Sequence, residues 1–236
     1  EGANLAGSLN FDSIGYLLLH GNFHQSVQGN LDEGEYLIRT IGKHIPGFHA
    51  ITVNGHLFHN AGATLVQELA FSLASGNEYM ADLTSKGLSA DSIAGSLRFS
   101  LGIGSDYFME IAKLRAARML WSAVIEQYKP ENPESRKMFI HSTTSLWNKT
   151  LYDPYVNLLR TTTEGMSPAI GNTDSMTTLP FDFPYSDDSD FSRRIARNQQ
   201  LILKEETYLD KVVDPAAGSY YIENLTHSIA MYAWKM

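Results

Sequence analysis

Apolar, β-rich segments alternate with helical segments along the whole chain, and this alternation restricts the fold more than any other feature. Six candidate strands begin roughly every 35 to 47 residues, and a helical pattern follows each of them. This order is typical of βαβ units, in which parallel strands are joined through helices. The candidate strands lie at 6–10, 50–53, 97–101, 138–142, 175–179 and 211–213.

The number of units points to part of a (β/α)8 TIM barrel, with about six of its eight βα units present. No G-x-G-x-x-G motif follows a candidate strand, so a dinucleotide-binding fold has little support. A complete barrel of this class has eight units. We therefore expect the first two units outside these residues, and an open barrel with free edges at 6–10 and 211–213.

Start and stop signals define several of the helices. Thr64, with Gln67 three residues later, fits a capping box and begins a helix that runs to about Leu83. The clearest helical pattern covers 106–128 and stops before Pro130. The other expected helices lie near 14–19, 35–44, from Asp91, from Asp153, at 191–206 and at 225–234.

Charge and cysteine content exclude several function classes. The chain has 18 basic and 26 acidic residues, and its net charge of −8 argues against nucleic acid as a partner. It has no cysteine, which removes disulfides and thiol catalysis. No apolar run approaches the roughly 18 residues of a membrane helix, and the first residues lack a signal-peptide pattern. We expect a cytoplasmic protein without a membrane partner.

The segment 48–64 is the best candidate for the border of a reaction centre. Ile51 and Val53 predict a strand, and Asn54-Gly55 predicts a turn after it. In parallel α/β folds the loops after the strands hold the site. The loop expected here carries His56, His59 and Asn60.

A metal site is not expected in this segment. His49, His56 and His59 lie close together in the sequence, but no carboxylate shares the loop and the spacing matches no zinc signature. The acidic run 187–190 lacks the glycine and the distal glutamate of an EF-hand loop. His141, at the end of a candidate strand, fits a ligand contact and a structural hydrogen bond equally well.

Four longer stretches together resemble the methylmalonyl-CoA mutase family. They are FMEIAKLRAARMLW (108–121), DPYVNLLRTT (153–162), FSRRIARNQQLILKEE (191–206) and VVDPAAGSYYIENLT (212–226). The resemblance covers nearly the whole chain. It implies that residues 1–236 are part of an acyl-CoA mutase (β/α)8 barrel domain, and that the cobalamin-binding domain of this family is not in these residues. In the family, adenosylcobalamin starts a radical rearrangement of methylmalonyl-CoA to succinyl-CoA.

The resemblance is to the small subunit of the heterodimeric members of the family. The stretches ITVNGHLFHNAGA, SRRIARN and TTLPFD have the character of that subunit. A homologous large catalytic subunit is therefore the implied partner. Adenosylcobalamin is expected on the large subunit, and no cofactor is expected on this segment.

Compared position by position, most of the family's catalytic pattern is absent. Leu57 stands where catalytic chains have the histidine that contacts the thioester carbonyl, and His56 stands where they have a tyrosine. Asn10 replaces a glutamine, while His20 and Ser96 replace two arginines, the first of which pairs with the substrate carboxylate. The resemblance thus implies that this segment has no catalytic residue.

A remnant of the pocket is implied on the fourth candidate strand. His141 keeps its family identity, but Thr143 replaces a glutamine. The expected remnant substrate pocket consists of Asn10, His20, His56, Leu57, Ser96, His141 and Thr143. Two alternatives stay open: an active mutase for a different acyl-CoA that uses His56 or His59, and a barrel that binds CoA esters without turning them over.

Overall fold

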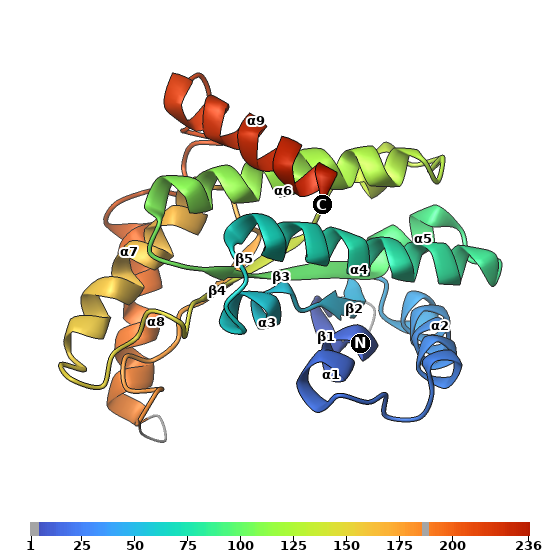
Figure 1. The fold of residues 1–236 in the computed structure, drawn as a ribbon, viewed down its shortest axis with the longest axis horizontal. Helices are drawn as coiled ribbons and strands as arrows, with labels where there is room; N and C mark the ends of the chain where they lie inside the picture. The colour runs from blue at the N-terminus through green and yellow to red at the C-terminus, as the bar shows by residue number, and fades with distance from the viewer. Residues whose placement is uncertain (1–4, 186–188) are drawn as a thin grey trace.

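The structure, a computed structural model, describes residues 5–185 and 189–236. It contains one parallel sheet of five strands in the order β1-β2-β3-β4-β5, curled into part of a barrel (Figure 1). Neighbouring strands in the sheet are also consecutive in the sequence, so each connection is a helical crossover. The strands are β1 (Gly7–Phe11), β2 (Phe48–Val53), β3 (Leu97–Ile103), β4 (Ile140–Thr144) and β5 (Ser175–Thr177).

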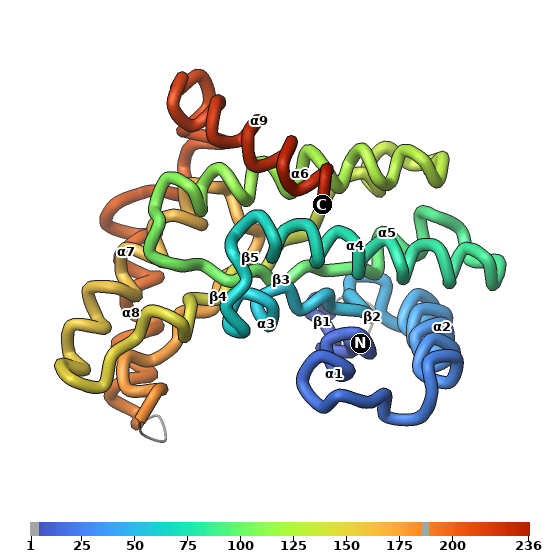
Figure 2. Tube along the Cα trace, viewed as in Figure 1, coloured from blue at the N-terminus to red at the C-terminus, as the bar shows by residue number. Residues whose placement is uncertain are grey.

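Helices cover the outer side of the curled sheet (Figure 1). The tube in Figure 2 shows α2 and α7 at opposite ends of it, with α4 and α6 between them beside β3. The last helix, α9, packs on α6 and α4. The helices are α1 (Ser13–His20), α2 (Val27–His44), α3 (Gly55–Asn60), α4 (Leu65–Ser85), α5 (Ala90–Ser96), α6 (Tyr107–Glu126), η2 (Pro133–Arg136), α7 (Val156–Ile170), α8 (Asp190–Glu205) and α9 (Tyr220–Lys235).

The hydrophobic core is built around the central strand β3, against which α4 and α6 pack. Its register with β4 is regular from Phe99↔Ile140 to Ile103↔Thr144. Phe99 packs edge-on against Trp121 of α6, with ring centroids 4.6 Å apart. Gly76 of α4 allows this contact, because a Cβ at position 76 would lie 2.7 Å from the Phe99 ring and 2.9 Å from Trp121. The glycine that weakens α4 locally therefore lets the helix approach the sheet.

Two predictions about secondary structure were wrong. Residues 211–213 form a bend and not a sixth strand, and Val212 and Val213 are 61% and 83% exposed. Their β-branched side chains favour a strand, but no described strand pairs with them, and β5 has only three residues. The expected polar loop after β2 is the short helix α3. The five other strands, their parallel order and the capping box of Thr64 and Gln67 are confirmed.

Candidate functional site

The concave face of the sheet carries a row of polar side chains from three neighbouring strands. Side chains alternate along a strand, so Arg98 and Ser100 point to the side opposite Phe99, away from α6. His141 of β4 is in register with Ser100 on one side and with Ser175 of β5 on the other. The concave face therefore combines residues that are 77 positions apart in the sequence (98 to 175).

His141 is held by two hydroxyl groups of β5. Its Nδ1 lies 2.8 Å from Ser175 Oγ, and its Nε2 lies 3.1 Å from Thr177 Oγ1. Burial, followed by the nearby positive charge of Arg98 and by His56, lowers the pKa of His141 to about 4. The imidazole is therefore neutral near pH 7, with both ring nitrogens engaged by hydroxyls.

Arg98 is the cationic residue of this face. Burial lowers the pKa of its guanidinium, yet an arginine stays charged in a protein. Its Nε is buried and makes no hydrogen bond within the described part of the chain. The charge of Arg98 also lowers the pKa of His49, after the larger effect of burial on that histidine.

Helix α3 lies above the carboxyl end of β3, and its two histidines differ in their hydrogen-bond partners. His59 Nε2 lies 2.8 Å from Ser145 Oγ, and His59 Nδ1 lies 3.4 Å from Glu68 Oε2. His56 is half-buried, and its Nδ1 has no hydrogen-bond partner among residues 5–185 and 189–236. Burial lowers the pKa of His56. Of the two histidines, only His56 contributes to the lowered pKa of His141. His59 contacts Ser145 and Glu68 and belongs to a different group of side chains.

That group is a buried network of charges that joins α4 and α6 to the end of β3. Lys113 Nζ contacts Glu68 Oε2 at 2.7 Å, Glu110 Oε2 at 2.6 Å and the Gly102 carbonyl at 2.6 Å. The backbone N–H groups of Gly102 and Gly104 donate to the second oxygens of Glu68 and Glu110. Burial alone would raise the pKa of Glu68, but Lys113 and His59 lower it. The network is a structural clamp, since its side chains have almost no exposed surface.

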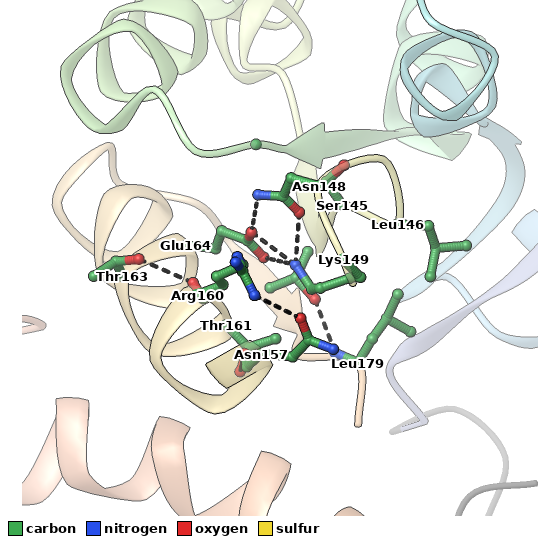
Figure 3. Close-up of polar contacts among 12 residues, drawn as sticks. Ser145, Leu146, Asn148, Lys149, Asn157, Arg160, Thr161, Thr163, Glu164 and Leu179 are labelled. Atoms are coloured by element: carbon green, nitrogen blue, oxygen red, sulfur yellow. Dashed lines mark hydrogen bonds and ion pairs between the residues drawn. The ribbon is translucent and has the colours of Figure 1, made fainter. Parts of the chain in front are cut away.

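A second buried ion pair lies in the loop after β4 (Figure 3). Lys149 Nζ lies 2.7 Å and 2.6 Å from the two oxygens of Glu164 on α7, and the Asn148 amide donates to the same carboxylate at 2.6 Å. Burial lowers the pKa of Lys149 and raises that of Glu164, while the attraction between the two opposes both changes. The pair fixes the loop above β4 to α7.

The structure brings only some of the predicted pocket residues together. His56, His141 and Thr143 lie on or beside the concave face, as β4 and α3 position them. Asn10 lies away from them and lines a cavity of about 260 Å³ together with Asp12, Tyr16 and His24.

The remaining three residues lie at the ends of helices or against α1. His20 is exposed at the end of α1, where its ring lies 4.2 Å from that of Tyr16. Leu57 lies against α1, since its Cδ1 is 3.2 Å from the position that a Cβ of Gly15 would take. Ser96 is buried as the last residue of α5.

Sequence reasoning missed Arg98, Lys149 and Glu164. A signal for Arg98 was present, because it is the one charged residue inside the otherwise apolar and small segment 97–103. Lys149 and Glu164 gave no such signal, because they lie 15 positions apart and meet only through the fold. Among the described residues, no group of three or more histidine, aspartate or glutamate side chains is arranged to hold a metal ion. No described helix is long and apolar enough to span a membrane.

The geometry defines a class of protein: a parallel β/α barrel segment with a polar concave face. Comparison with known proteins identifies the family. The family model for methylmalonyl-CoA mutase matches residues 1–236, and the chain belongs to this family.

Named relatives refine this result. The methylmalonyl-CoA mutase small subunit of Porphyromonas gingivalis is 53% identical over 195 residues, which cover 82% of this chain and 32% of the relative. The large subunit of the same organism is 36% identical over 239 residues (100% of this chain, 33% of the relative). The methylmalonyl-CoA mutase of Rhizobium meliloti is 43% identical over 230 residues (98% and 32%). The chain therefore spans about a third of the length of these relatives, and its similarity to a small subunit is confirmed.

Proposed function

We propose that this chain is part of the small subunit of an adenosylcobalamin-dependent methylmalonyl-CoA mutase and that it does no chemistry itself. Its role is to pair with the homologous large catalytic subunit and to support that subunit's barrel. The heterodimer is cytoplasmic in this proposal. Residues 1–236 are part of the acyl-CoA mutase barrel domain, and the cobalamin-binding domain lies in other residues. The identity of 53% to a relative named as a small subunit supports the proposal.

The proposal that this chain catalyses no reaction rests mainly on the identity and position of Leu57. It lies on α3 above the sheet, against Gly15 of α1. An aliphatic side chain cannot donate a hydrogen bond or a proton to a carbonyl oxygen. Removing one such donor from an enzyme typically lowers its rate on the order of 10² to 10³.

The position of His20 supports the same conclusion. Its ring is tilted against that of Tyr16 and exposed at the end of α1. A histidine there supplies neither the permanent charge nor the two-pronged hydrogen bonding of an arginine. A substrate carboxylate would therefore not be bound by a charged, two-pronged contact at this position.

We assign the cofactor to the large subunit. Bound adenosylcobalamin supplies a radical through cleavage of its carbon–cobalt bond. In this family the lower ligand of cobalt comes from an Asp-x-His-x-x-Gly motif, and none of the eight histidines of this sequence has an aspartate two positions before it. The residues present do not fit the lower side of the cofactor, so the role proposed for this chain includes no step through it.

The alternative function is an active mutase for a different acyl-CoA, and the structure favours His56 over His59 for that role. His59 is hydrogen-bonded to Ser145 and lies beside Glu68, so it is part of the buried network. His56 has a ring nitrogen without a partner in the described residues and lies near His141. A neutral imidazole is a competent proton donor or acceptor near pH 7.

Two measurements test the proposal. Native purification of the full-length protein should yield a stable complex with a large mutase subunit, with an interface well above about 1,000 Å², as is typical of obligate pairs. The separated protein, supplied with adenosylcobalamin and methylmalonyl-CoA, should give no turnover. Turnover that disappears in a His56→Ala variant would assign the chemistry to this chain and support the alternative.

A further inference from the structure

A cavity of about 260 Å³ lies at the carboxyl end of β1, between α1 and α2. The two helices lie beside each other next to β1 (Figure 1). The end of β1, the first half of α1, the loop before α2 and the first two turns of α2 line the cavity. Its volume is below the roughly 300–1,000 Å³ of pockets for drug-sized ligands, so it suits a small molecule.

The lining of this cavity is negatively charged. It includes Asp12 and Glu33, and neither lysine nor arginine is among the described residues that line it. Even a protonated His24 would leave the lining negative, because it would balance only one of the two carboxylates. The cavity beside α9 differs, since it is lined by Asp214 together with Arg115, its ion-pair partner. The charge of the cavity between α1 and α2 therefore favours a cationic ligand.

The two carboxylates differ in what they can still bind. Oδ1 of Asp12 accepts hydrogen bonds from the Gly15 N–H at 3.0 Å and from the Tyr79 hydroxyl at 2.8 Å. Its Oδ2 accepts from the Asn54 N–H at 2.8 Å. Glu33 forms no hydrogen bond or ion pair within the described part of the chain. Asp12 thus supplies a fixed negative charge, and Glu33 is available for direct contact with a ligand.

A buried amide adds a hydrogen-bond donor to the lining. Asn30 is only 3% exposed, and its Oδ1 accepts from the Gln25 N–H at 3.1 Å, which fixes the orientation of the amide. Its Nδ2 donates to no group among residues 5–185 and 189–236, and Asn30 lines the cavity. A buried donor without an acceptor is unfavourable, so an acceptor on a ligand would satisfy it.

Aromatic rings favour an organic cation over a metal ion. Phe11 and Tyr16 line the cavity, and the Tyr16 ring meets that of His24 edge-on, with centroids 6.0 Å apart. The face of an aromatic ring attracts ammonium groups. Hard metal ions instead require several oxygen ligands, and both oxygens of Asp12 are already engaged. In the described part of the chain, no group of three or more acidic or histidine side chains is arranged for a metal ion.

We propose that the cavity between α1 and α2 binds a small organic cation that carries one ammonium group and one hydrogen-bond-accepting oxygen. The ammonium group contacts the Glu33 carboxylate beside the aromatic rings, and the oxygen accepts from Asn30 Nδ2. A charge-assisted hydrogen bond of this kind is stronger than a neutral one. The site is separate from the side chains of the concave face, and the proposal does not depend on the function proposed above.

The test uses purified full-length protein with neither cobalamin nor acyl-CoA added, so its outcome is separate from that of the proposed function. Methoxyethylamine, which has an ammonium group and an ether oxygen at pH 7, is titrated while binding heat and melting temperature are measured. Methoxyethanol lacks the charge, and sodium chloride at matched ionic strength lacks the organic group. We expect saturable binding and a higher melting temperature with the amine only. No binding of the amine, or equal effects of the amine and either comparison compound, would overturn the proposal.

The variant Glu33→Gln locates the ammonium contact. It should weaken methoxyethylamine binding by about tenfold or more, as is typical for loss of a hydrogen bond to a charged group. Glu78→Gln, at an exposed position of α4, removes the same charge and should bind like the parent protein. Equal binding by the two variants would overturn the assignment. Without ligand, Glu33→Gln should melt close to the parent protein, and a much lower melting temperature would assign Glu33 a structural role instead.

The variant Asn30→Asp tests the donor. It keeps an acceptor for the Gln25 N–H but replaces the amide NH₂ by an oxygen. Butylamine has a methylene group where methoxyethylamine has its oxygen, so any general loss of affinity affects both amines. The preference for methoxyethylamine over butylamine should fall by about fivefold relative to the parent protein, the contribution of one hydrogen bond. An unchanged preference would overturn the role of Asn30, and if Asn30→Asp does not fold, the Glu33→Gln titration still decides the proposal.

Discussion

Lys113 Nζ lies 2.7 Å from Glu68 Oε2, and both side chains are completely buried. The lysine also contacts Glu110 at 2.6 Å, so one cation balances two carboxylates between α4, α6 and β3. Taking charges out of water is costly, and the arrangement is stable only while each charge keeps its partners. The geometry of the upper end of β3 therefore depends on this network.

Lys113→Met should be strongly destabilising. It leaves Glu68 and Glu110 buried without a cation, and breaking such a group typically costs about 3–5 kcal/mol of unfolding free energy. The quantity is measured by urea denaturation of the purified protein. Lys137→Met, in a pair with Glu134 that is mostly exposed, is the control and should change little. Equal midpoints for the two variants would contradict the assignment of the network as a clamp.

His141 should make the protein less stable in mild acid. Its pKa in the folded state is about 4, below the ordinary value of 6.5, so between these values the unfolded chain binds more protons. Its contribution is complete above about pH 6.5 and is lost as the pH falls toward 4. Because the ring is partly exposed to screening solvent, we expect a contribution of only about 1–2 kcal/mol.

The variant His141→Gln tests this contribution. Glutamine does not titrate, so the decrease in unfolding free energy between pH 7 and pH 4 should be smaller than in the parent protein. His49 and His56, whose pKa values burial also lowers, retain their share of the decrease. His20→Gln, at an exposed position, is the control. An unchanged pH profile in His141→Gln would rule out His141 as a source of the acid sensitivity.

Gly76→Ala should destabilise the protein despite the higher helix propensity of alanine. The added methyl group would lie 2.7 Å from the Phe99 ring, and overpacking of this kind costs about 1–3 kcal/mol. Gly42→Ala is a matched control, because a Cβ at position 42 of α2 meets no atom within 4 Å. That variant should gain up to about 1 kcal/mol from helix propensity alone. Opposite signs in thermal or urea unfolding are the expected result.

Sequence patterns predicted the elements that have strong local periodicity and a burial environment to match. The segment LRFSL at 97–101 is the start of β3, the central strand, which has a paired strand on each side. Val212 and Val213 have the same β-branched character, but they lie beyond the edge strand and remain in a bend. Strand propensity describes a side chain that fits a paired strand, and pairing depends on the whole fold.

The prediction of a turn and a loop at Asn54-Gly55 was wrong for a related reason. The N–H of Asn54 donates to Asp12 Oδ2 at 2.8 Å, from a residue 42 positions earlier, and α3 begins at Gly55. No local pattern contains that contact. The comparison with the family predicted one pocket that includes Asn10, His20, His56 and His141. The structure places His56 near His141, whereas Asn10 and His20 lie elsewhere, around α1. Arg98 was visible in the sequence but required the alternation of β3 to be recognised as facing the concave side.

Restoring the missing donor alone should not create a mutase. In full-length protein free of the large subunit and supplied with adenosylcobalamin, Leu57→His should leave methylmalonyl-CoA turnover at background. Position 57 faces Gly15 of α1, so a histidine there would still need to reorient toward the concave face. The carboxylate arginine also remains absent at His20, and groups that act as a unit do not contribute additively. The double variant Leu57→His with His20→Arg should therefore remain at background as well, with a thermal melt as the control for folding. Turnover in either folded variant would mean that the rest of the catalytic machinery is intact in this chain, and that its silence depends on one or two side chains only.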